Sequence, residues 1–134
     1  MDMHVNIMPI LNKAGYFTVE PHGPIDSDNY LDFRDKISPL LTKTTKSVIL
    51  DLADVDYISS AGLGVLFTMK KHLMGQNGDL VFCHLKPQIR RLFEIVNALP
   101  QETMFKSVEE ADAYLYKMMN REIDKNLEKN KRLE

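Results

Sequence analysis

Residues 47–73, SVILDLADVDYISSAGLGVLFTMKKHL, carry the clearest indication of the fold in this sequence. It opens with an apolar and β-branched run over residues 48–52, which is typical of a strand buried on both faces, as in a parallel sheet. Ser59 and Ser60 follow a short polar connection, and a helical spacing of apolar residues begins at Leu63. A strand, a serine-bearing turn and a helix make half of a βαβ unit. In such sheets, ligand and partner sites lie beyond the carboxyl ends of the strands, so the serine hydroxyls are expected on the functional edge.

Before this stretch, the sequence predicts a hairpin and a helix. Apolar runs over residues 4–11 and 16–20 flank a glycine-containing turn at 12–15, which indicates two strands. Turn residues follow and include Asp26, a good helix N-cap. The next helix should kink or end early at Pro39, because proline lacks the N–H and clashes with the preceding turn. The predicted inner face of this helix carries Tyr30, Phe33, Ile37, Leu40 and Leu41.

After this stretch, the sequence predicts two more strands and two more helices. Residues 75–78, Gly-Gln-Asn-Gly, stop the helix, and residues 80–85 read as another buried strand. Pro87 marks the first turn of a helix, and residues 104–105 suggest a short edge strand. Residues 107–110 form a capping box that opens a last helix. The predicted inner faces of these two helices carry Ile89, Leu92, Phe93 and Val96, and then Val108, Ala111, Leu115 and Met118.

The predicted fold is therefore a single α/β domain. Its order is ββαβαβα(β)α, with a mixed sheet of four to five strands and about four helices over residues 1–119. Residues 120–134 are mostly charged, and we expect them to form a helical extension or tail. Such a terminus usually frays in solvent, and the alternative is a small docking helix with Ile123 and Leu127 one turn apart.

Composition excludes several functional classes. At 134 residues the chain fits one domain with a real core. Its net charge of -2 lacks the basic footprint of a nucleic-acid-binding protein. The first ten residues do not resemble a signal peptide, and no apolar run approaches the roughly 20 residues that cross a bilayer. Cys83, the single cysteine, excludes an internal disulfide. We expect a cytoplasmic protein that binds neither nucleic acid nor membrane.

Residues 50–66, LDLADVDYISSAGLGVL, resemble the signature of STAS domains, specifically the bacterial anti-sigma factor antagonists. In that family a buried strand leads to a hydrophobic-Asp-Ser-Ser-Gly-Leu-Gly turn and a helix. Ser59 takes the place of the aspartate, Ser60 matches the serine that a partner kinase phosphorylates, and Ala61 replaces the second serine. Residues 62–64, Gly-Leu-Gly, match directly. The departure at Ser59 removes a carboxylate beside the target hydroxyl and offers a second hydroxyl next to it.

A second segment extends the resemblance to residues 4–118. Residues 23–26, Gly-Pro-Ile-Asp, are similar to the family's Gly-x-hydrophobic-Asp before the first helix, where the aspartate helps to form the partner-binding surface. The resemblance therefore implies phosphorylation at Ser60. The partner-binding residues that it implies are Asp26, Ser59, Ser60, Ala61, Gly62, Leu63 and Gly64.

The resemblance implies a regulatory module without catalytic activity or a cofactor, present as a monomer or weak dimer. The unphosphorylated form would bind an anti-sigma factor serine kinase and so release the sigma factor. Phosphorylation at Ser60 would end the binding, and a serine phosphatase would restore it. One alternative is a STAS subunit of a transporter or of a stress-sensing complex. A small serine hydrolase using Ser60 ranks far lower, because no base stands at recognisable spacing.

The two candidate site residues also have simpler structural interpretations. Serine and aspartate are both good N-caps, so Ser60 and Asp26 can each serve only to start a helix. The two interpretations are compatible if Ser59 caps the helix while Ser60 points outward. If the second and third strands are parallel, the turns after them share one edge of the sheet, which would place Asp26 and Ser60 on a common surface.

No other motif in the sequence indicates a cofactor, catalytic or metal site. Gly62-x-Gly64 lacks the third glycine of a dinucleotide loop, because Phe67 stands there. The serines lack the glycine of a nucleophile elbow. Cys83 lies in an apolar run and is most simply a core thiol. The histidines show no ligand spacing, so we expect no metal site; they are His4, His22, His72 and His84.

Overall fold

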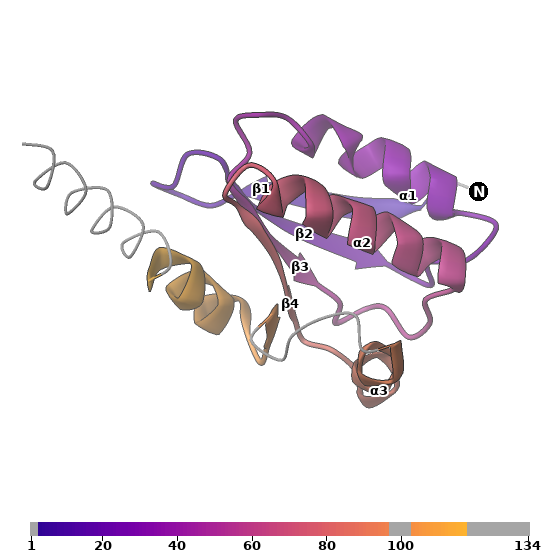
Figure 1. Ribbon diagram of the computed structural model, residues 1–134. Coiled ribbons are helices and arrows are strands. Elements are labelled where there is room, and N and C mark those ends of the chain that lie inside the picture. Colours follow the sequence, from indigo (N-terminus) through magenta and orange to yellow (C-terminus); the bar gives the residue numbers. More distant parts are fainter. Residues whose placement is uncertain (1–2, 97–102, 118–134) are drawn as a thin grey trace, which may run out of the picture.

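Five strands form one mixed sheet whose strand order, β1-β2-β3-β4-β5, follows the order of the chain (Figure 1). The computed structural model describes residues 3–96 and 103–117. β1 (His4–Pro9) pairs antiparallel with β2 (Tyr16–His22). The remaining strands are each parallel to the strand before: β3 (Ser47–Asp51), β4 (Asp79–Cys83) and β5 (Met104–Phe105). The predicted hairpin and parallel core are therefore both present.

One face of the sheet is covered by helices α1 (Tyr30–Ile37) and α2 (Ser60–Met74) (Figure 1). Helix α3 (Pro87–Val96) adds Ile89 and Phe93 to the same core. Val48 and Leu50 of β3 point into it, whereas Ile49 points to the opposite face. β3 is thus buried on both faces, as its unbroken apolar run predicts. The largest fully buried side chains of this core are Ile25, Phe33, Ile37, Leu50, Leu52, Leu66, Met69, Leu73, Leu80, Phe82 and Phe93.

The opposite face is covered by a fourth helix, which the structure describes over residues 108–117. Ala111 and Leu115 of this helix pack into a second apolar cluster with Tyr16, Ile49, Val81 and Cys83. The predicted capping box forms in part. Ser107 Oγ accepts from the N–H of Glu110 at 3.1 Å, while the Glu110 carboxylate contacts the Lys106 N–H at 3.4 Å instead of that of Ser107.

Pro39 ends α1, as predicted. The α-helix stops at Ile37 and the chain continues as a 3₁₀ turn over Ser38–Leu40 with the proline inside it. The 3₁₀ turn tolerates the missing N–H because Pro39 stands in its first positions, and the hydrogen bond of the turn runs from the Leu41 N–H to the Ser38 carbonyl at 2.9 Å. Leu40 still reaches the core, where it is 6% exposed.

An ionic clip fastens the start of β1 to α1. The N–H of Met3 donates to Asp32 Oδ2 at 2.6 Å, and Lys36 Nζ donates to the same oxygen at 3.0 Å. Lys36 Nζ also bonds to the Met3 carbonyl. The Met3 hydrogen bond, followed by that of Lys36, lowers the pKa of Asp32 below its ordinary 3.8. The clip therefore depends on an ionised carboxyl group.

The predicted order ββαβαβα(β)α is confirmed, with five strands and four helices in the described residues. The first strand ends at Pro9, two residues before the predicted end, because the Ile10 N–H bonds to the Tyr16 carbonyl and closes the turn there. Met118 and the predicted tail at 120–134 lie outside the described residues. Within residues 3–96 and 103–117, no helix has the length and apolar character to cross a membrane.

Candidate functional site

The two serines after β3 have different structural roles. Ser59 has an extended backbone (φ -79°, ψ 170°), its Oγ accepts from the Gly62 N–H at 3.1 Å, and its carbonyl accepts from the Leu63 N–H at 2.9 Å. Ser59 is therefore the N-cap of α2. Ser60 is the first helical residue and is exposed. Ser60 is therefore not the N-cap, and of the two possibilities left open by the sequence the structure has Ser59 as the cap and Ser60 exposed.

The turn that carries Asp26 lies beside the serine turn. Ile25 and Ile58 form an isolated parallel bridge. The Ile25 N–H donates to the Tyr57 carbonyl at 3.0 Å, and the Ser59 N–H donates to the Ile25 carbonyl at 2.8 Å. Both turns thus continue strand-like pairing past the ends of β2 and β3. This confirms the prediction that they share one edge of the sheet.

Asp26 organises the turn that leads into α1. Its Oδ1 accepts from the N–H of Asp28 at 2.9 Å and from that of Asn29 at 3.0 Å. Asn29 Oδ1 accepts in return from the Asp26 N–H at 2.8 Å. The N-cap of α1 is Asn29, which has no side-chain capping bond, so the interpretation of Asp26 as the helix N-cap is wrong and its carboxylate orders the preceding turn instead. The Asp26 residue is half-buried.

Gly62 is required by the close approach of the two turns. A Cβ at this position would lie 2.8 Å from Ile25 Cγ2 and 3.0 Å from the Ile25 carbonyl oxygen. Gly62 and Leu63 are both buried, so they shape the site from below and do not present side chains to a partner. At Gly64, which is exposed, an added Cβ would meet nothing within 4 Å. The accessible part of the serine turn therefore comprises Ser60, half-buried Ala61 and Gly64.

A groove between α1 and α2 continues this accessible surface. It encloses about 300 Å³ and includes Ala61 and Gly64 in its wall. Arg34, which contacts Asp35 at 3.2 Å, supplies a cation at its rim. Sequence reasoning did not find this groove, because its two walls come from separate helices whose mutual packing is not readable from spacing. The remaining lining residues are Tyr30, Ile37, Leu41, Val65 and Thr68.

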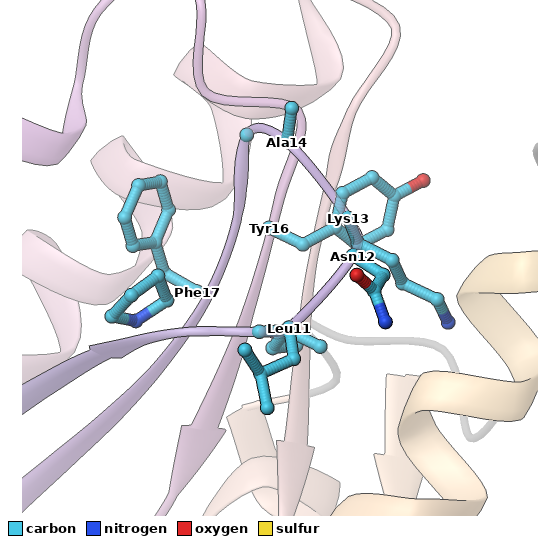
Figure 2. Close-up of a pocket in the computed structure, with 9 residues that line it drawn as sticks. Leu11, Asn12, Lys13, Ala14, Tyr16 and Phe17 are labelled. Carbon is cyan, nitrogen blue, oxygen red and sulfur yellow. The ribbon is translucent and has the colours of Figure 1, made fainter.

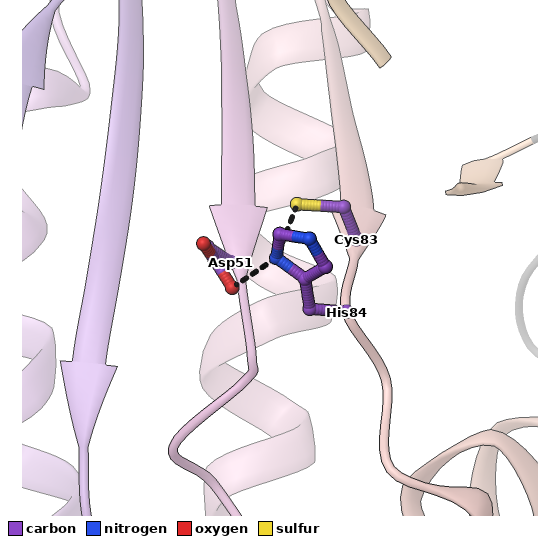
Figure 3. A group of neighbouring side chains, drawn as sticks. All are labelled: Asp51, Cys83 and His84. Carbon is purple, nitrogen blue, oxygen red and sulfur yellow. Dashed lines mark hydrogen bonds and ion pairs between the residues drawn. The ribbon is translucent and has the colours of Figure 1, made fainter. Parts of the chain in front are cut away.

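Sequence reasoning also missed a polar cluster at the ends of β3 and β4 (Figure 3). His84 Nδ1 lies 3.0 Å from Asp51 Oδ1 and 3.9 Å from Cys83 Sγ. Burial, followed by the negative charges of Asp51, Glu109 and Glu20, raises the pKa of the Cys83 thiol to about 12. The interpretation of Cys83 as a core thiol is confirmed, because the residue is buried in the second apolar cluster, and its sulfur also lies beside two polar side chains.

A separate hollow lies at the hairpin turn between β1 and β2, at the opposite end of β2 from the Asp26 turn (Figure 2). It encloses about 420 Å³ and is lined by residues 9–17. Lys13 forms an ion pair with Asp112 at 2.7 Å across to the fourth helix, while Leu11 is 87% exposed. Because this turn precedes β2, it is remote from the carboxyl ends of the parallel strands and from the serine turn.

The mixed sheet, the helices on both faces and the capped serine turn define an α/β domain with a helix-terminal site. The profile of the STAS domain family matches residues 8–111. The chain belongs to the STAS domain family. This finding confirms the family resemblance of the serine turn and the predicted fold.

Two curated relatives carry names that indicate a regulatory role. BtrV of Bordetella bronchiseptica, named as a candidate anti-sigma factor antagonist, is 41% identical over 73 residues, which are 54% of this chain. The match spans 63% of the length of BtrV. The anti-sigma-B factor antagonist of Staphylococcus epidermidis is 28% identical over 93 residues, covering 69% of this chain and 85% of the relative.

Solved structures share the fold at low sequence identity. The anti-sigma factor antagonist SpoIIAA in its unphosphorylated form has a TM-score of 0.64 at 17% identity, covering 82% of this chain and 94% of SpoIIAA. The phosphorylated form of SpoIIAA, from Bacillus, has a TM-score of 0.62, also at 17% identity, covering 81% of this chain and 97% of SpoIIAA. The transporter-family protein SLC26A9 has a TM-score of 0.71 at 13% identity, covering 92% of this chain and 25% of SLC26A9. The fold alone therefore occurs in antagonists and in a much larger protein.

Proposed function

We propose that this protein is an anti-sigma factor antagonist switched by phosphorylation at Ser60. The observation that carries the proposal is the exposed position of Ser60 in the first turn of α2, while the neighbouring Ser59 supplies the cap. The Ser60 hydroxyl is therefore free to be modified without loss of the helix start. The names of the two curated relatives support the same role.

In the proposed cycle, the unphosphorylated protein binds an anti-sigma factor serine kinase, which then releases its sigma factor. The kinase transfers the γ-phosphoryl group of ATP to Ser60 Oγ; ADP leaves and the hydroxyl proton passes to solvent. A serine phosphatase hydrolyses the phosphate ester with water, which restores the hydroxyl and yields inorganic phosphate. The protein itself catalyses neither step and acts in the cytoplasm as a monomer or weak dimer.

The proposed binding face combines the accessible serine turn with the Asp26 turn. Asp26, Ser60, Ala61 and Gly64 supply its surface, and Ser59 supplies the cap beneath it. Gly62 and Leu63 contribute through the backbone geometry that they allow. Phosphorylation adds about -1.5 to -2 charges at this face. A partner surface fitted to a neutral hydroxyl would then meet a dianion without a paired cation, which weakens binding strongly.

Phosphate at Ser60 is compatible with the folded domain. The N-terminus of a helix carries partial positive charge and main-chain N–H groups, so it favours an anion. The switch therefore acts on the partner and not on the fold of this protein.

The alternative role as a transporter subunit rests on the fold alone, since the likeness to SLC26A9 is at 13% identity. The serine hydrolase alternative requires a base near Ser60. The hydrogen bonds of His22 go to Asn6 and Asp54, and those of His84 go to Asp51 and Cys83. Neither histidine is thus directed to the serine turn, and the antagonist role is favoured.

A pull-down with Ser60→Ala as bait tests the proposal, because this variant should bind the kinase without being released by phosphorylation. Proteins retained from native lysate in the presence of ATP are identified by mass spectrometry, with Ser60→Asp as the matched control bait. Recovery of a serine kinase on Ser60→Ala but not on Ser60→Asp supports the proposal. Equal recovery on both baits, or recovery of a membrane transporter on both, contradicts it.

A further inference from the structure

The cluster of Asp51, Cys83 and His84 converges on one point (Figure 3). Their ligand atoms, a carboxylate oxygen, the thiol sulfur and an imidazole nitrogen, all lie within 4.8 Å of one another. Asp51 and Cys83 are paired in the register of β3 and β4, so both side chains leave the same face of the sheet at the carboxyl ends of these strands. The strand pairing therefore fixes two of the three donors relative to each other.

The third donor is brought in by an unusual backbone conformation. His84 has φ +56°, a left-handed conformation that is uncommon for residues other than glycine, although histidine adopts it several times more often than most side chains, as asparagine and aspartate do. Successive side chains on a strand point to opposite faces, but this conformation turns the His84 ring back towards Cys83 and Asp51. Such backbone outliers are often retained where they position a functional group.

The geometry does not fit a nucleophilic triad. In a triad the base contacts the nucleophile through one ring nitrogen and the carboxylate through the other. Here Cys83 Sγ and Asp51 Oδ1 both approach the same nitrogen, Nδ1 of His84. Three donors around a common point are instead the arrangement of ligands around a cation.

Two of the three donor separations lie close to those of a tetrahedral metal site. Zinc bonds of about 2.3 Å to sulfur and about 2.0–2.1 Å to nitrogen and oxygen imply separations of about 3.6 Å for S···N and about 3.3 Å for N···O. The observed separations are 3.9 Å between Cys83 Sγ and His84 Nδ1 and 3.0 Å between Asp51 Oδ1 and the same nitrogen. The third separation, between Cys83 Sγ and the Asp51 carboxylate, is within 4.8 Å, against about 3.6 Å in a tetrahedral site.

The surroundings favour a cation and leave it a path of entry. Glu20 and Glu109 add their negative charge to that of Asp51 around the thiol. The side chain of His84 is 40% exposed, whereas that of Asp51 is 12% exposed and Cys83 is buried. The site is therefore open on the imidazole side, and a water molecule can take the fourth position there.

We propose that Asp51, Cys83 and His84 bind a divalent cation of the zinc class, with water as the fourth ligand. The mixture of thiolate, imidazole and carboxylate suits Zn²⁺ better than the hard cations Mg²⁺ or Ca²⁺, which prefer oxygen ligands. The bound ion would tie the end of β3 to the end of β4. This site is independent of the phosphorylation proposed at Ser60.

Titration of the full chain with Co²⁺ tests the proposal, because Co²⁺ replaces Zn²⁺ in tetrahedral sites and reports thiolate ligation by its absorption. The protein is first treated with a chelator and a non-thiol reductant. We expect saturation at one equivalent of Co²⁺, with a thiolate-to-cobalt charge-transfer band and the visible bands of four-coordinate Co²⁺. Added Zn²⁺ should displace the Co²⁺ and so remove the charge-transfer band and the visible bands.

His84→Asn is the most informative variant, because asparagine tolerates the left-handed backbone and keeps Cys83 in place. We expect its Co²⁺ affinity to fall by at least about tenfold, and Cys83→Ala should lose the charge-transfer band. His72→Asn is the matched control, since His72 is an exposed histidine near the end of α2, and it should titrate as the wild type does.

Two outcomes would overturn the proposal. One is the absence of a charge-transfer band in the wild-type protein at excess Co²⁺. The other is an unchanged Co²⁺ affinity in His84→Asn. If Cys83→Ala does not fold, NMR spectra of the histidine rings in the wild type replace it. Addition of Zn²⁺ should shift the ring signals of His84 and leave those of His72 in place. A shift of the His72 signals without a shift of the His84 signals contradicts the site.

Discussion

The main-chain N–H of Ser59 donates to the carbonyl oxygen of Ile25 at 2.8 Å, which joins two turns that are distant in the sequence. Through this bond and the Ile25–Ile58 bridge, the residues directly after Ile25 and Ser59 are held in a fixed relation. These residues are Asp26 and Ser60. The proposed binding face is therefore already formed in the free protein, and little ordering is needed when a partner binds.

Ser60, and not Ser59, should receive phosphate from the cognate kinase, because only the Ser60 hydroxyl is free of the cap. Ser59→Ala should keep the labelling but lose about 0.5–2 kcal/mol of stability, the usual loss for an N-cap. Peptide mapping after kinase treatment and urea unfolding measure the two effects. Labelling that survives in Ser60→Ala and disappears in Ser59→Ala would reverse the assignment.

Ser60→Asp should fold with nearly unchanged thermal stability, since an anion in the first turn of a helix is stabilising by about 0.3–1 kcal/mol. Its affinity for the kinase should fall about a hundredfold or more, which corresponds to about 2.7 kcal/mol. Ser60→Ala should bind as well as the unmodified protein. Calorimetric titration of the three proteins compares them directly. Early melting of Ser60→Asp would show that the charge acts on the fold instead.

Asp26→Asn should affect binding more than folding. The asparagine oxygen can still accept the hydrogen bonds that Asp26 Oδ1 receives from Asp28 and Asn29, so stability should change by a few tenths to about 1 kcal/mol. Affinity for the kinase should fall further if the carboxylate meets a basic group of the partner. A binding isotherm identical to that of the wild type would leave Asp26 only the role of ordering its turn.

Gly62→Ala and Gly64→Ala should change stability in opposite directions, although the two glycines are two positions apart on one helix. The new Cβ of Gly62→Ala would collide with Ile25 and should cost about 1–3 kcal/mol. That of Gly64→Ala meets nothing within 4 Å, so the helix should gain up to about 1 kcal/mol from the better propensity of alanine. Urea unfolding of both variants is the measurement. Equal effects would mean that the approach of Ile25 to α2 is looser than the structure gives.

Asp32→Asn should lower stability at neutral pH but not in acid. The folded-state pKa of Asp32 lies below its ordinary 3.8, so the unfolded state binds a proton first as the pH falls. The contribution of the carboxylate is thus present above pH 3.8 and is lost as the pH falls through the folded-state value. Unfolding curves at several pH values should show the wild type and variant converging below pH 3.8. Asp35→Asn, at an exposed position of the same helix, should show a smaller difference.

Local patterns in the sequence were sufficient to predict the serine turn. The β3 run is apolar without alternation because Val48 and Ile49 point into cores on opposite faces, and this pattern is visible in the sequence alone. The rules of helix starts allow either serine as the cap, and only the structure assigns the cap to Ser59. The shared edge of the Asp26 and Ser60 turns followed once parallel pairing was assumed.

Features that depend on tertiary packing could not be predicted in this way. The cluster of Asp51, Cys83 and His84 requires both the register of β3 on β4 and the left-handed backbone of His84. Neither is encoded in residue spacing, and a search for ligand spacing along one segment therefore finds nothing. The groove between α1 and α2 depends in the same way on how two helices pack.

The order of the strands across the sheet has a consequence for synthesis on the ribosome. Every strand lies next to the strand made just before it, from β1 to β5. Each new strand can therefore add to an edge that already exists, without waiting for a distant part of the chain and without displacing an earlier pairing. The serine turn, which follows the third strand, can be complete while the last third of the protein is still being translated.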